Sequence, residues 1–301
     1  MSGMTVRRAA HFVPGANEKM FTKALGTEAD ALILDLEDAV TPEQKDSARA
    51  VISEWLKVVP FGAKERMVRI NPIDTPWFRA DLEATMVDPP DSYMIPKVHG
   101  PDDVRLVDRV VTELEGLHGH EPGSVKLVVL GTETPRGFQN IDAIPCVDRI
   151  DALTWGAEDL SAAIGARRNR GPDGAYLPLF EQARTACMIS AAAAGVQPLD
   201  TVFVDVTDPD GLRQDCLDAA WIGFTGKISI HPSQIDVINE VFTPSEDDID
   251  RARALLAELE LQQANGRMAF RFEGQMVDVP HFTQARRTLA LAESLENRAS
   301  D

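Results

Sequence analysis

The chain has 301 residues, 44% of them hydrophobic, which is enough to bury one large core or two small ones. Acidic residues outnumber basic residues by 48 to 30, so the composition argues against nucleic acid or an anionic membrane as a partner. The three cysteines lie far apart and form no CxxC pair, and the N-terminal stretch MSGMTVRRAAHFVPG lacks the apolar segment of a secretory signal. We therefore expect a cytoplasmic protein with reduced thiols and no membrane-spanning helix.

Short apolar runs alternate with longer amphipathic stretches over residues 1–243. The runs predict eight strands, at 9–13, 31–36, 66–70, 92–98, 125–130, 151–156, 201–206 and 222–230. Helices are predicted over 42–59, 101–117, 179–195 and 209–223. This alternation predicts a parallel sheet, and eight repeats favour a closed (β/α)8 TIM barrel. A doubly wound open sheet is the alternative, but no GxGxxG motif follows an early strand.

Residues 244–301 break the alternation and are predicted to form a C-terminal extension of the barrel. A helix is expected over 244–264, a hairpin over 266–279 with Glu273 and Gly274 near its turn, and a second helix over 280–297. We therefore divide the chain into a catalytic barrel, 1–243, and an extension, 244–301.

Charged side chains stand where the predicted strands end. They are Glu37 and Asp38 after the second strand, Arg69 after the third, Lys97 after the fourth, Glu133 after the fifth, Glu158 and Asp159 after the sixth, and Asp205 in the seventh. Active sites of TIM barrels lie at the C-terminal ends of the strands, so these side chains are expected to converge. Carboxylates so close together would repel one another without a cation, and such a set is typical of a Mg²⁺ site.

Eight motifs in chain order carry a family resemblance. They are RRAAHFVPG, LILDLEDAV, VRINP, IPKV, ETPRG, GAEDLSAAIGARR, GFTGKISIHPSQ and GQMVDVP. The chain resembles the family of the citrate lyase beta subunit, malyl-CoA lyase and citramalyl-CoA lyase over nearly its whole length. The resemblance implies a Mg²⁺-dependent (β/α)8 barrel that cleaves or forms a carbon–carbon bond in a short 3-hydroxyacyl-CoA, with acetyl-CoA and pyruvate or glyoxylate as the products of cleavage.

The resemblance assigns a role to each acid. Glu133 and Asp159 match the two ligands of Mg²⁺, for which Mn²⁺ is a possible substitute. Glu37 and Asp38 match acids that hold metal-bound water. Asp278 matches an aspartate that a neighbouring subunit supplies, which implies a homotrimer or hexamer, and it would protonate the enolate carbon of acetyl-CoA.

Substrate contacts are expected from further residues. Arg69 matches the arginine that contacts the substrate's carboxylate and carbonyl oxygens and would stabilise developing negative charge. Glu133 and Lys97 are placed beside the substrate. Pro135, which replaces the family's usual alanine, Gly156 and the loop 165–174 are expected to set which acyl group fits. The candidates for the phosphates of coenzyme A are Arg8, Lys19 and Lys227, because basic side chains bind phosphate.

Alternatives remain for each of these residues. Structural alternatives are a helix cap for Glu133 and Asp159, an ion pair with Glu37 for Arg69, and a turn for Asp278. Lys97 could instead form a Schiff base, and the loop 165–174 is either a mobile flap or an exposed loop.

Three other functions remain open beside the free CoA lyase. The first is a citrate lyase beta subunit that acts on a carrier-bound citryl thioester. The second is a malyl-CoA thioesterase, which would use the same metal with water. The third is a non-enzymatic metabolite-binding barrel, which would need no such set of charged residues.

Overall fold

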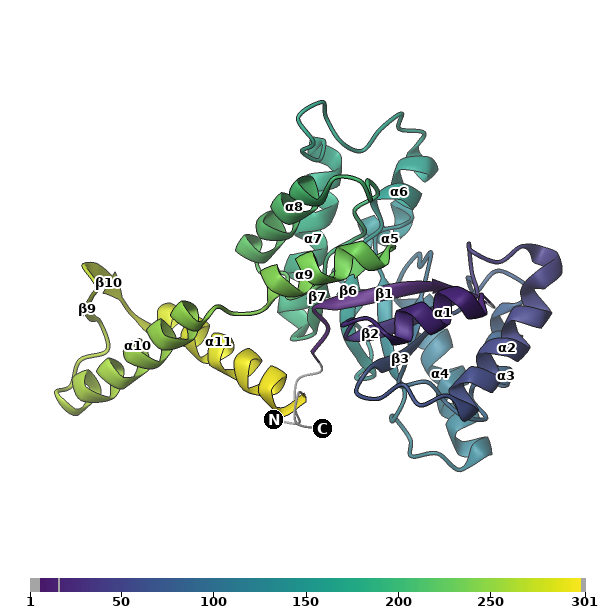
Figure 1. Cartoon of the computed structure of the whole chain (residues 1–301), viewed down its shortest axis with the longest axis horizontal. Helices are drawn as coiled ribbons and strands as arrows, with labels where there is room; N and C mark the ends of the chain where they lie inside the picture. The colour runs from purple at the N-terminus through teal and green to yellow at the C-terminus, as the bar shows by residue number, and fades with distance from the viewer. Residues whose placement is uncertain (1–5, 16, 299–301) are drawn as a thin grey trace. The chain divides into compact units, whose positions relative to one another are not determined.

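The computed structural model describes residues 6–15 and 17–298, and contacts divide the chain into a larger unit, residues 7–239, and a smaller unit that contains residues 240–298 (Figure 1). No helix in the described part of the chain is long and apolar enough to cross a membrane.

Eight parallel strands form the centre of the larger unit. They are β1 (Ala9–Pro14), β2 (Ala31–Asp35), β3 (Glu65–Arg69), β4 (Ser92–Ile95), β5 (Lys126–Leu130), β6 (Ile150–Thr154), β7 (Gln197–Leu199) and β8 (Lys227–Ser229). They pair in the order β7-β6-β5-β4-β3-β2-β1-β8. A bridge between Asp200 and Lys227 joins the two ends of this order, so the strands close into a ring. The predicted TIM barrel is confirmed.

Helices alternate with the strands and cover their outer side. They are α1 (Glu18–Leu25), α2 (Lys45–Val58), α3 (Phe78–Thr85), α4 (Pro101–His118), α5 (Pro135–Gln139), α6 (Ala157–Ile164), α7 (Pro178–Ala194), α8 (Pro209–Ile222) and α9 (Ile235–Phe242). Figure 1 shows α2, α3 and α4 side by side outside the strands. Aromatic side chains help to fix this layer: the ring of Phe21 in α1 stacks on that of Trp55 in α2, with centroids 4.0 Å apart.

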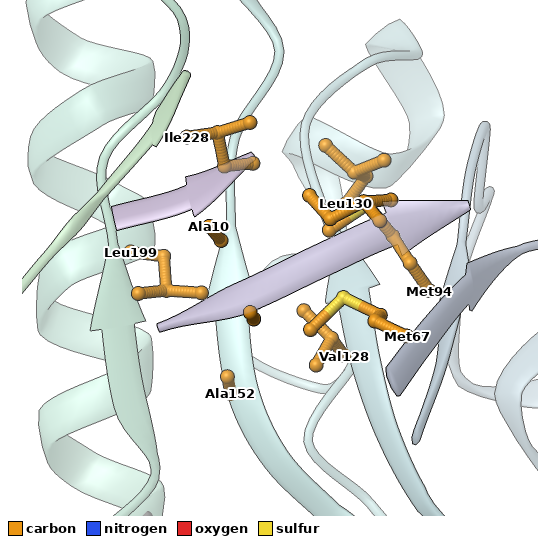
Figure 2. Close-up of a cluster of buried hydrophobic side chains, with 10 residues drawn as sticks. Ala10, Met67, Met94, Val128, Leu130, Ala152, Leu199 and Ile228 are labelled. Atoms are coloured by element: carbon orange, nitrogen blue, oxygen red, sulfur yellow. The ribbon is translucent and has the colours of Figure 1, made fainter. Parts of the chain in front are cut away.

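The barrel interior is filled by one or two apolar side chains from each strand. The cluster comprises Ala10, Ala31, Ile33, Met67, Met94, Val128, Leu130, Ala152, Leu199 and Ile228, and Figure 2 shows most of them pointing toward one another. Small side chains on some strands face larger ones on others, which is how a closed barrel fills its interior. The interior is therefore a packed core, and a functional site has to lie at one of its ends.

Two strand predictions need correction. The seventh strand is Gln197–Leu199, not 201–206, and the eighth is only Lys227–Ser229 within the predicted 222–230. The stretch TVFVDV mimics a strand, but Val204 and Val206 are 53% and 41% exposed, whereas Leu199 is fully buried. Hydrophobic alternation alone does not distinguish a partly exposed loop of this composition from a buried strand.

The smaller unit has a core of its own. Helix α10 (Glu246–Ala264) packs against α11 (Val279–Arg298), and a hairpin of β9 (Phe270–Phe272) and β10 (Gln275–Val277) joins them. Phe270 and Phe282 stack with ring centroids 5.6 Å apart. Glu273 and Gly274 have positive φ values of 47° and 84°, as a tight hairpin turn requires, so the predicted helix–hairpin–helix is confirmed.

Candidate active site

An aspartate and an arginine lie together at the C-terminal edge of the barrel. Because side chains alternate along a strand, Asp35 follows Ile33 on the inward face of β2. Arg69 ends β3 and is paired in register with Asp35. Its Nε and Nη2 each donate a hydrogen bond of 2.7 Å to the Asp35 carboxylate. Burial alone would raise the pKa of Asp35, but Arg69 and two backbone N–H groups outweigh burial and lower it.

Glu37 lies beside this ion pair and is also buried. Its Oε2 lies 2.8 Å from Nη1 of Arg69, and its Oε1 accepts a hydrogen bond of 2.5 Å from Nζ of Lys97. The guanidinium of Arg69 also lies over the ring of Phe12, 4.5 Å from its centroid. Arg69 therefore does pair with Glu37, as the structural alternative held, but it does so at the mouth of the barrel and with Asp35 as well.

Glu133 is held by the backbone of the neighbouring strand's loop. The N–H of Lys97 donates a hydrogen bond of 2.6 Å to Oε2 of Glu133, whose side chain is almost fully buried. On the other side, Glu133 packs on Gly156, where a Cβ would lie 2.5 Å from Cγ of Glu133. The Glu133 side chain occupies the space that a Cβ at position 156 would require, which explains the glycine there. Thr134, not Glu133, caps helix α5, so the cap alternative for Glu133 is wrong.

Asp38 and Asp159 complete the group. Nζ of Lys97 lies 3.0 Å from Oδ2 of Asp38 and 3.4 Å from Oδ1 of Asp159, which stands in the first turn of α6. No side chain caps α6, whose N-cap residue is Gly156. The structure therefore brings together six of the eight residues predicted from the strand ends: Glu37, Asp38, Arg69, Lys97, Glu133 and Asp159. Glu158 instead accepts a hydrogen bond from Asn169, and Asp205 accepts one from Thr207.

The group carries more negative than positive charge. Five carboxylates, those of Asp35, Glu37, Asp38, Glu133 and Asp159, face the two cations of Arg69 and Lys97. Burial, with a contribution from Asp38, raises the pKa of Glu37 to about 7. Burial, Glu37 and Asp159 raise the pKa of Glu133 to about 8. A further cation would relieve this repulsion.

Two further side chains, Lys45 and Asn71, hold the turn that carries Glu37, and the sequence analysis did not identify them. Nζ of Lys45 donates hydrogen bonds of 2.7 and 2.6 Å to the carbonyl oxygens of Leu36 and Glu37. Nδ2 of Asn71 donates one of 3.0 Å to the Leu36 carbonyl oxygen. No sequence pattern identifies a lysine that binds backbone carbonyl groups eight and nine residues away. The sequence does contain a signal for Asp35, the partner of Arg69. Asp35 lies two residues after Ile33 in ALILD, so its side chain is on the same inward face of the strand.

The side chain of Lys97 is committed to ion pairs. Burial would lower its pKa, but Glu37, Asp159 and Asp38 raise it well above the usual value. A Schiff-base lysine needs a neutral amine, so this environment argues against that alternative. Pro135 begins helix α5 directly after Thr134, and nothing in the structure assigns it a contact with an acyl group.

The three candidates for coenzyme A phosphates do not lie together. Lys19 is exposed on α1, the helix that follows the C-terminal end of β1. Arg8 precedes β1, at the opposite end of the barrel, where it pairs with Asp30. Lys227 is fully buried, with Nζ 2.6 Å from carboxylate oxygens of both Asp200 and Asp215. The expectation for Lys227 needs correction, because it has no surface to offer a phosphate.

The loop after α6 is anchored in the structure. Arg170 bridges to Tyr176 across the loop and stacks on its ring, with the guanidinium carbon 3.6 Å from the centroid. Nη2 of Arg170 also donates a hydrogen bond of 2.9 Å to Asp215 on α8. Asn169 donates one of 2.6 Å to Glu158 in the first turn of α6. The loop is therefore held near its middle, by Asn169 and Arg170, while residues 172–175 are exposed.

Asp278 lies in the smaller unit, at the start of α11. It is half exposed, and its Oδ1 lies 2.8 Å from Nδ1 of His281. Asp278 directly precedes the helix and does not lie in a turn, which was the alternative, and its role in a site stays a prediction.

Comparisons with known proteins identify the family of the chain. Residues 8–232 match the model of the HpcH/HpaI aldolase/citrate lyase family. The chain belongs to this family. It is 35% identical over 305 residues to the mitochondrial citramalyl-CoA lyase of Rattus norvegicus, covering 97% of this chain and 88% of that protein. It is 35% identical over 291 residues to the (3S)-malyl-CoA thioesterase of Cereibacter sphaeroides, covering 96% and 95% of the two chains.

A solved structure extends the similarity to three dimensions. The crystal structure of protein CitE from Mycobacterium tuberculosis, in complex with magnesium, acetoacetate and coenzyme A, matches with a TM-score of 0.76 and 34% identity. The match covers 96% of this chain and 98% of that one. The resemblance drawn from the motifs is thereby confirmed.

Proposed function

We propose that the protein is a Mg²⁺-dependent carbon–carbon lyase that cleaves a short 3-hydroxyacyl-CoA, with citramalyl-CoA or malyl-CoA as the first candidates. The observation that carries the proposal is the cluster of Glu133, Asp159, Glu37 and Arg69 at the C-terminal mouth of a barrel of this family. Its relatives include a citramalyl-CoA lyase and a CitE bound to magnesium and coenzyme A.

The residues present fit a magnesium ion. In the described part of the chain, no set of three or more His, Cys, Asp or Glu side chains is arranged to hold a metal. Mg²⁺ needs only one or two carboxylates, because waters and substrate oxygens complete its shell. Glu133 and Asp159 are the two acids for this role. Five carboxylates face only two cations in this group, so its negative charge can balance a further cation.

Each residue contributes through its position. When bound, Mg²⁺ lowers the pKa of a coordinated hydroxyl and stabilises the resulting oxyanion. Arg69 is held rigidly by Asp35, so its guanidinium is a fixed donor for the substrate carboxylate and for charge that develops during cleavage. As the hydroxyl proton passes to water, the hydroxyl carbon becomes the keto carbon of the departing keto acid. The carbon–carbon bond breaks, and its electrons pass to the acetyl thioester as an enolate. Asp278 would then protonate the enolate carbon.

The smaller unit is proposed to supply Asp278 to a neighbouring subunit of a homotrimer or hexamer. The unit has its own core and carries Asp278 half exposed between a hairpin and a helix, which suits a residue delivered to another surface. On this proposal the barrel and the extension form separate functional parts, with the boundary near residue 243. The cytoplasmic location expected from the composition stays a prediction.

A thioesterase is the second candidate, because a malyl-CoA thioesterase is 35% identical over almost the whole chain. Such an enzyme would release free coenzyme A and malate. A citrate lyase beta subunit would need a carrier-bound thioester, and a binding protein would turn over nothing.

The test is an assay of the purified chain with citramalyl-CoA and malyl-CoA offered separately, with Mg²⁺ or with EDTA. The proposal expects acetyl-CoA together with pyruvate or glyoxylate, and no turnover in EDTA. Free coenzyme A without acetyl-CoA would move the assignment to the thioesterase. A folded protein that leaves both substrates intact would contradict both assignments.

A further inference from the structure

One basic side chain lies among the acids of the site. Nζ of Lys97 is 2.5 Å from Glu37, 3.0 Å from Asp38 and 3.4 Å from Asp159. These acids come from two different loops of the barrel mouth, after β2 and after β6, and Lys97 reaches both from the loop after β4. Arg69, the other cation of the group, forms ion pairs with Asp35 and Glu37. Lys97 is thus the cation that joins the acids across the mouth.

The backbone of Lys97 is also unusual. In residues 6–15 and 17–298, Lys97 and Glu273 are the non-glycine residues with positive φ, and Glu273 is explained by its hairpin turn. At Lys97 φ is 52°, a conformation that a lysine rarely adopts. This conformation lets its N–H reach Glu133 at 2.6 Å while its side chain turns toward the other acids. One residue therefore contacts both proposed ligands of the metal, Glu133 and Asp159.

An ammonium group and Mg²⁺ bind the same kind of oxygen atoms. If Asp159 ligates the metal, the two cations lie near one carboxylate and repel each other. Lys97 would then have to withdraw toward Glu37 and Asp38, and part of its interaction with Asp159 would be lost. A substrate-binding lysine, as the sequence analysis expected, would not oppose the metal in this way.

We propose that the Lys97 ammonium is an internal counter-ion of the acidic site, which holds the acids together and weakens the affinity for Mg²⁺ by competing for them. This inference rests on the proposed function, since it assumes that Glu133 and Asp159 hold the metal. In this arrangement the acids remain paired with Lys97 when Mg²⁺ dissociates. The affinity for Mg²⁺ then depends on how readily the ion displaces the Lys97 ammonium from the shared carboxylates.

The test measures Mg²⁺ binding by calorimetry in the absence of substrate, for the unmodified chain, Lys97→Asn and Lys97→Gly. Asparagine and glycine both tolerate positive φ, so these variants remove the ammonium and leave the backbone conformation. Lys57→Met, on the exposed side of α2, removes the same charge far from the acids and is the control. We expect both Lys97 variants to bind Mg²⁺ roughly tenfold or more tightly and the control to bind it unchanged.

Thermal unfolding provides a second readout that does not depend on activity. In EDTA the Lys97 variants should unfold at a lower temperature than the unmodified chain, because their acids repel one another, and saturating Mg²⁺ should reduce the difference. Unchanged or weaker Mg²⁺ affinity in folded Lys97 variants, with normal binding by the unmodified chain, would overturn this inference alone. Failure of the unmodified chain to bind Mg²⁺ would contradict the metal site of the proposed function and the inference with it.

Discussion

Glu133 and Gly156 illustrate how a single residue decides the geometry of the site. A Cβ on Gly156 would lie 2.5 Å from Cγ of Glu133, so Gly156→Ala must displace that carboxylate. A displacement of about 1 Å can lower a rate roughly 100-fold, and we expect a loss of kcat of this size. Gly116→Ala is the control, because a Cβ there meets no atom within 4 Å and alanine favours the helix. Normal kcat in Gly156→Ala would contradict the assigned position of Glu133.

The raised pKa values of Glu37 and Glu133 predict how stability depends on pH without metal. In the folded state the pKa of Glu37 is about 7 and that of Glu133 about 8, well above the usual value of 4.5. The folded state therefore binds more protons than the unfolded state between about pH 4.5 and 8. Their contribution to stability therefore falls as the pH rises. His11 acts in the opposite direction, because burial lowers its pKa from the usual 6.5 to about 4. Its contribution to stability rises with pH and changes little above about pH 6.5.

We therefore expect the melting temperature in EDTA to fall between about pH 6.5 and 8. Glu133→Gln, which cannot titrate, should show a shallower fall, and saturating Mg²⁺ should flatten the curve for the unmodified chain. Melting curves across this pH range check the prediction. Equal slopes for the variant and the unmodified chain would show that Glu133 does not carry the shift.

At the residue scale, the sequence could predict which charged groups meet but not how they are held. Each strand end places its side chain at one edge of the sheet, so Arg69, Glu133 and Asp159 could be grouped from their spacing alone. The period of two could also have placed Asp35 on the inward face of its strand, although the sequence analysis did not include it. The contacts of Lys45 with two carbonyl oxygens, and the positive φ of Lys97, depend on loop conformations that no local pattern encodes.

At the scale of elements, the seam between β7 and β8 depends on a buried ion cluster. Lys227 lies between Asp200 and Asp215, and all three are almost fully buried. Lys227→Met leaves two buried carboxylates with one partner fewer, so we expect a loss of about 3–5 kcal/mol in the free energy of unfolding. Urea unfolding measures it, with Lys57→Met as the control. If the variant instead keeps its stability and loses affinity for acyl-CoA, Lys227 contacts the substrate after all.

This seam is also where the prediction of elements was weakest. The other strands have four to six residues, and each includes at least two buried apolar residues, as a buried parallel sheet requires. Strands β7 and β8 have three residues each, and one of the buried side chains in β8 is the charged Lys227. A hydrophobicity pattern does not detect a short strand that is held by buried ion pairs, so it predicts the strand instead at the apolar but only partly buried TVFVDV.

At the scale of the whole molecule, the proposal that Asp278 acts in a neighbouring subunit predicts complementation. Asp278→Ala and Glu133→Gln should each be inactive alone. In randomly mixed oligomers, a site works when a subunit with intact Glu133 meets a neighbour with intact Asp278, so about one quarter of the normal activity should return. The assay compares the two variants before and after they are unfolded together and refolded. Mixtures without activity would indicate that Asp278 acts within its own chain, and activity of Asp278→Ala alone would show that Asp278 has no role in the reaction.

The most direct test of the central claim is the rate of acetyl-CoA release from citramalyl-CoA or malyl-CoA, whichever the chain cleaves, by Glu133→Gln and Glu158→Gln at saturating Mg²⁺. Glu158 is an exposed acid in the first turn of α6, next to Asp159, and glutamine there can still accept the hydrogen bond from Asn169. We expect a loss of at least about 100-fold for Glu133→Gln and nearly normal activity for Glu158→Gln. Nearly normal activity of a folded Glu133→Gln would contradict a metal-dependent site at the barrel mouth.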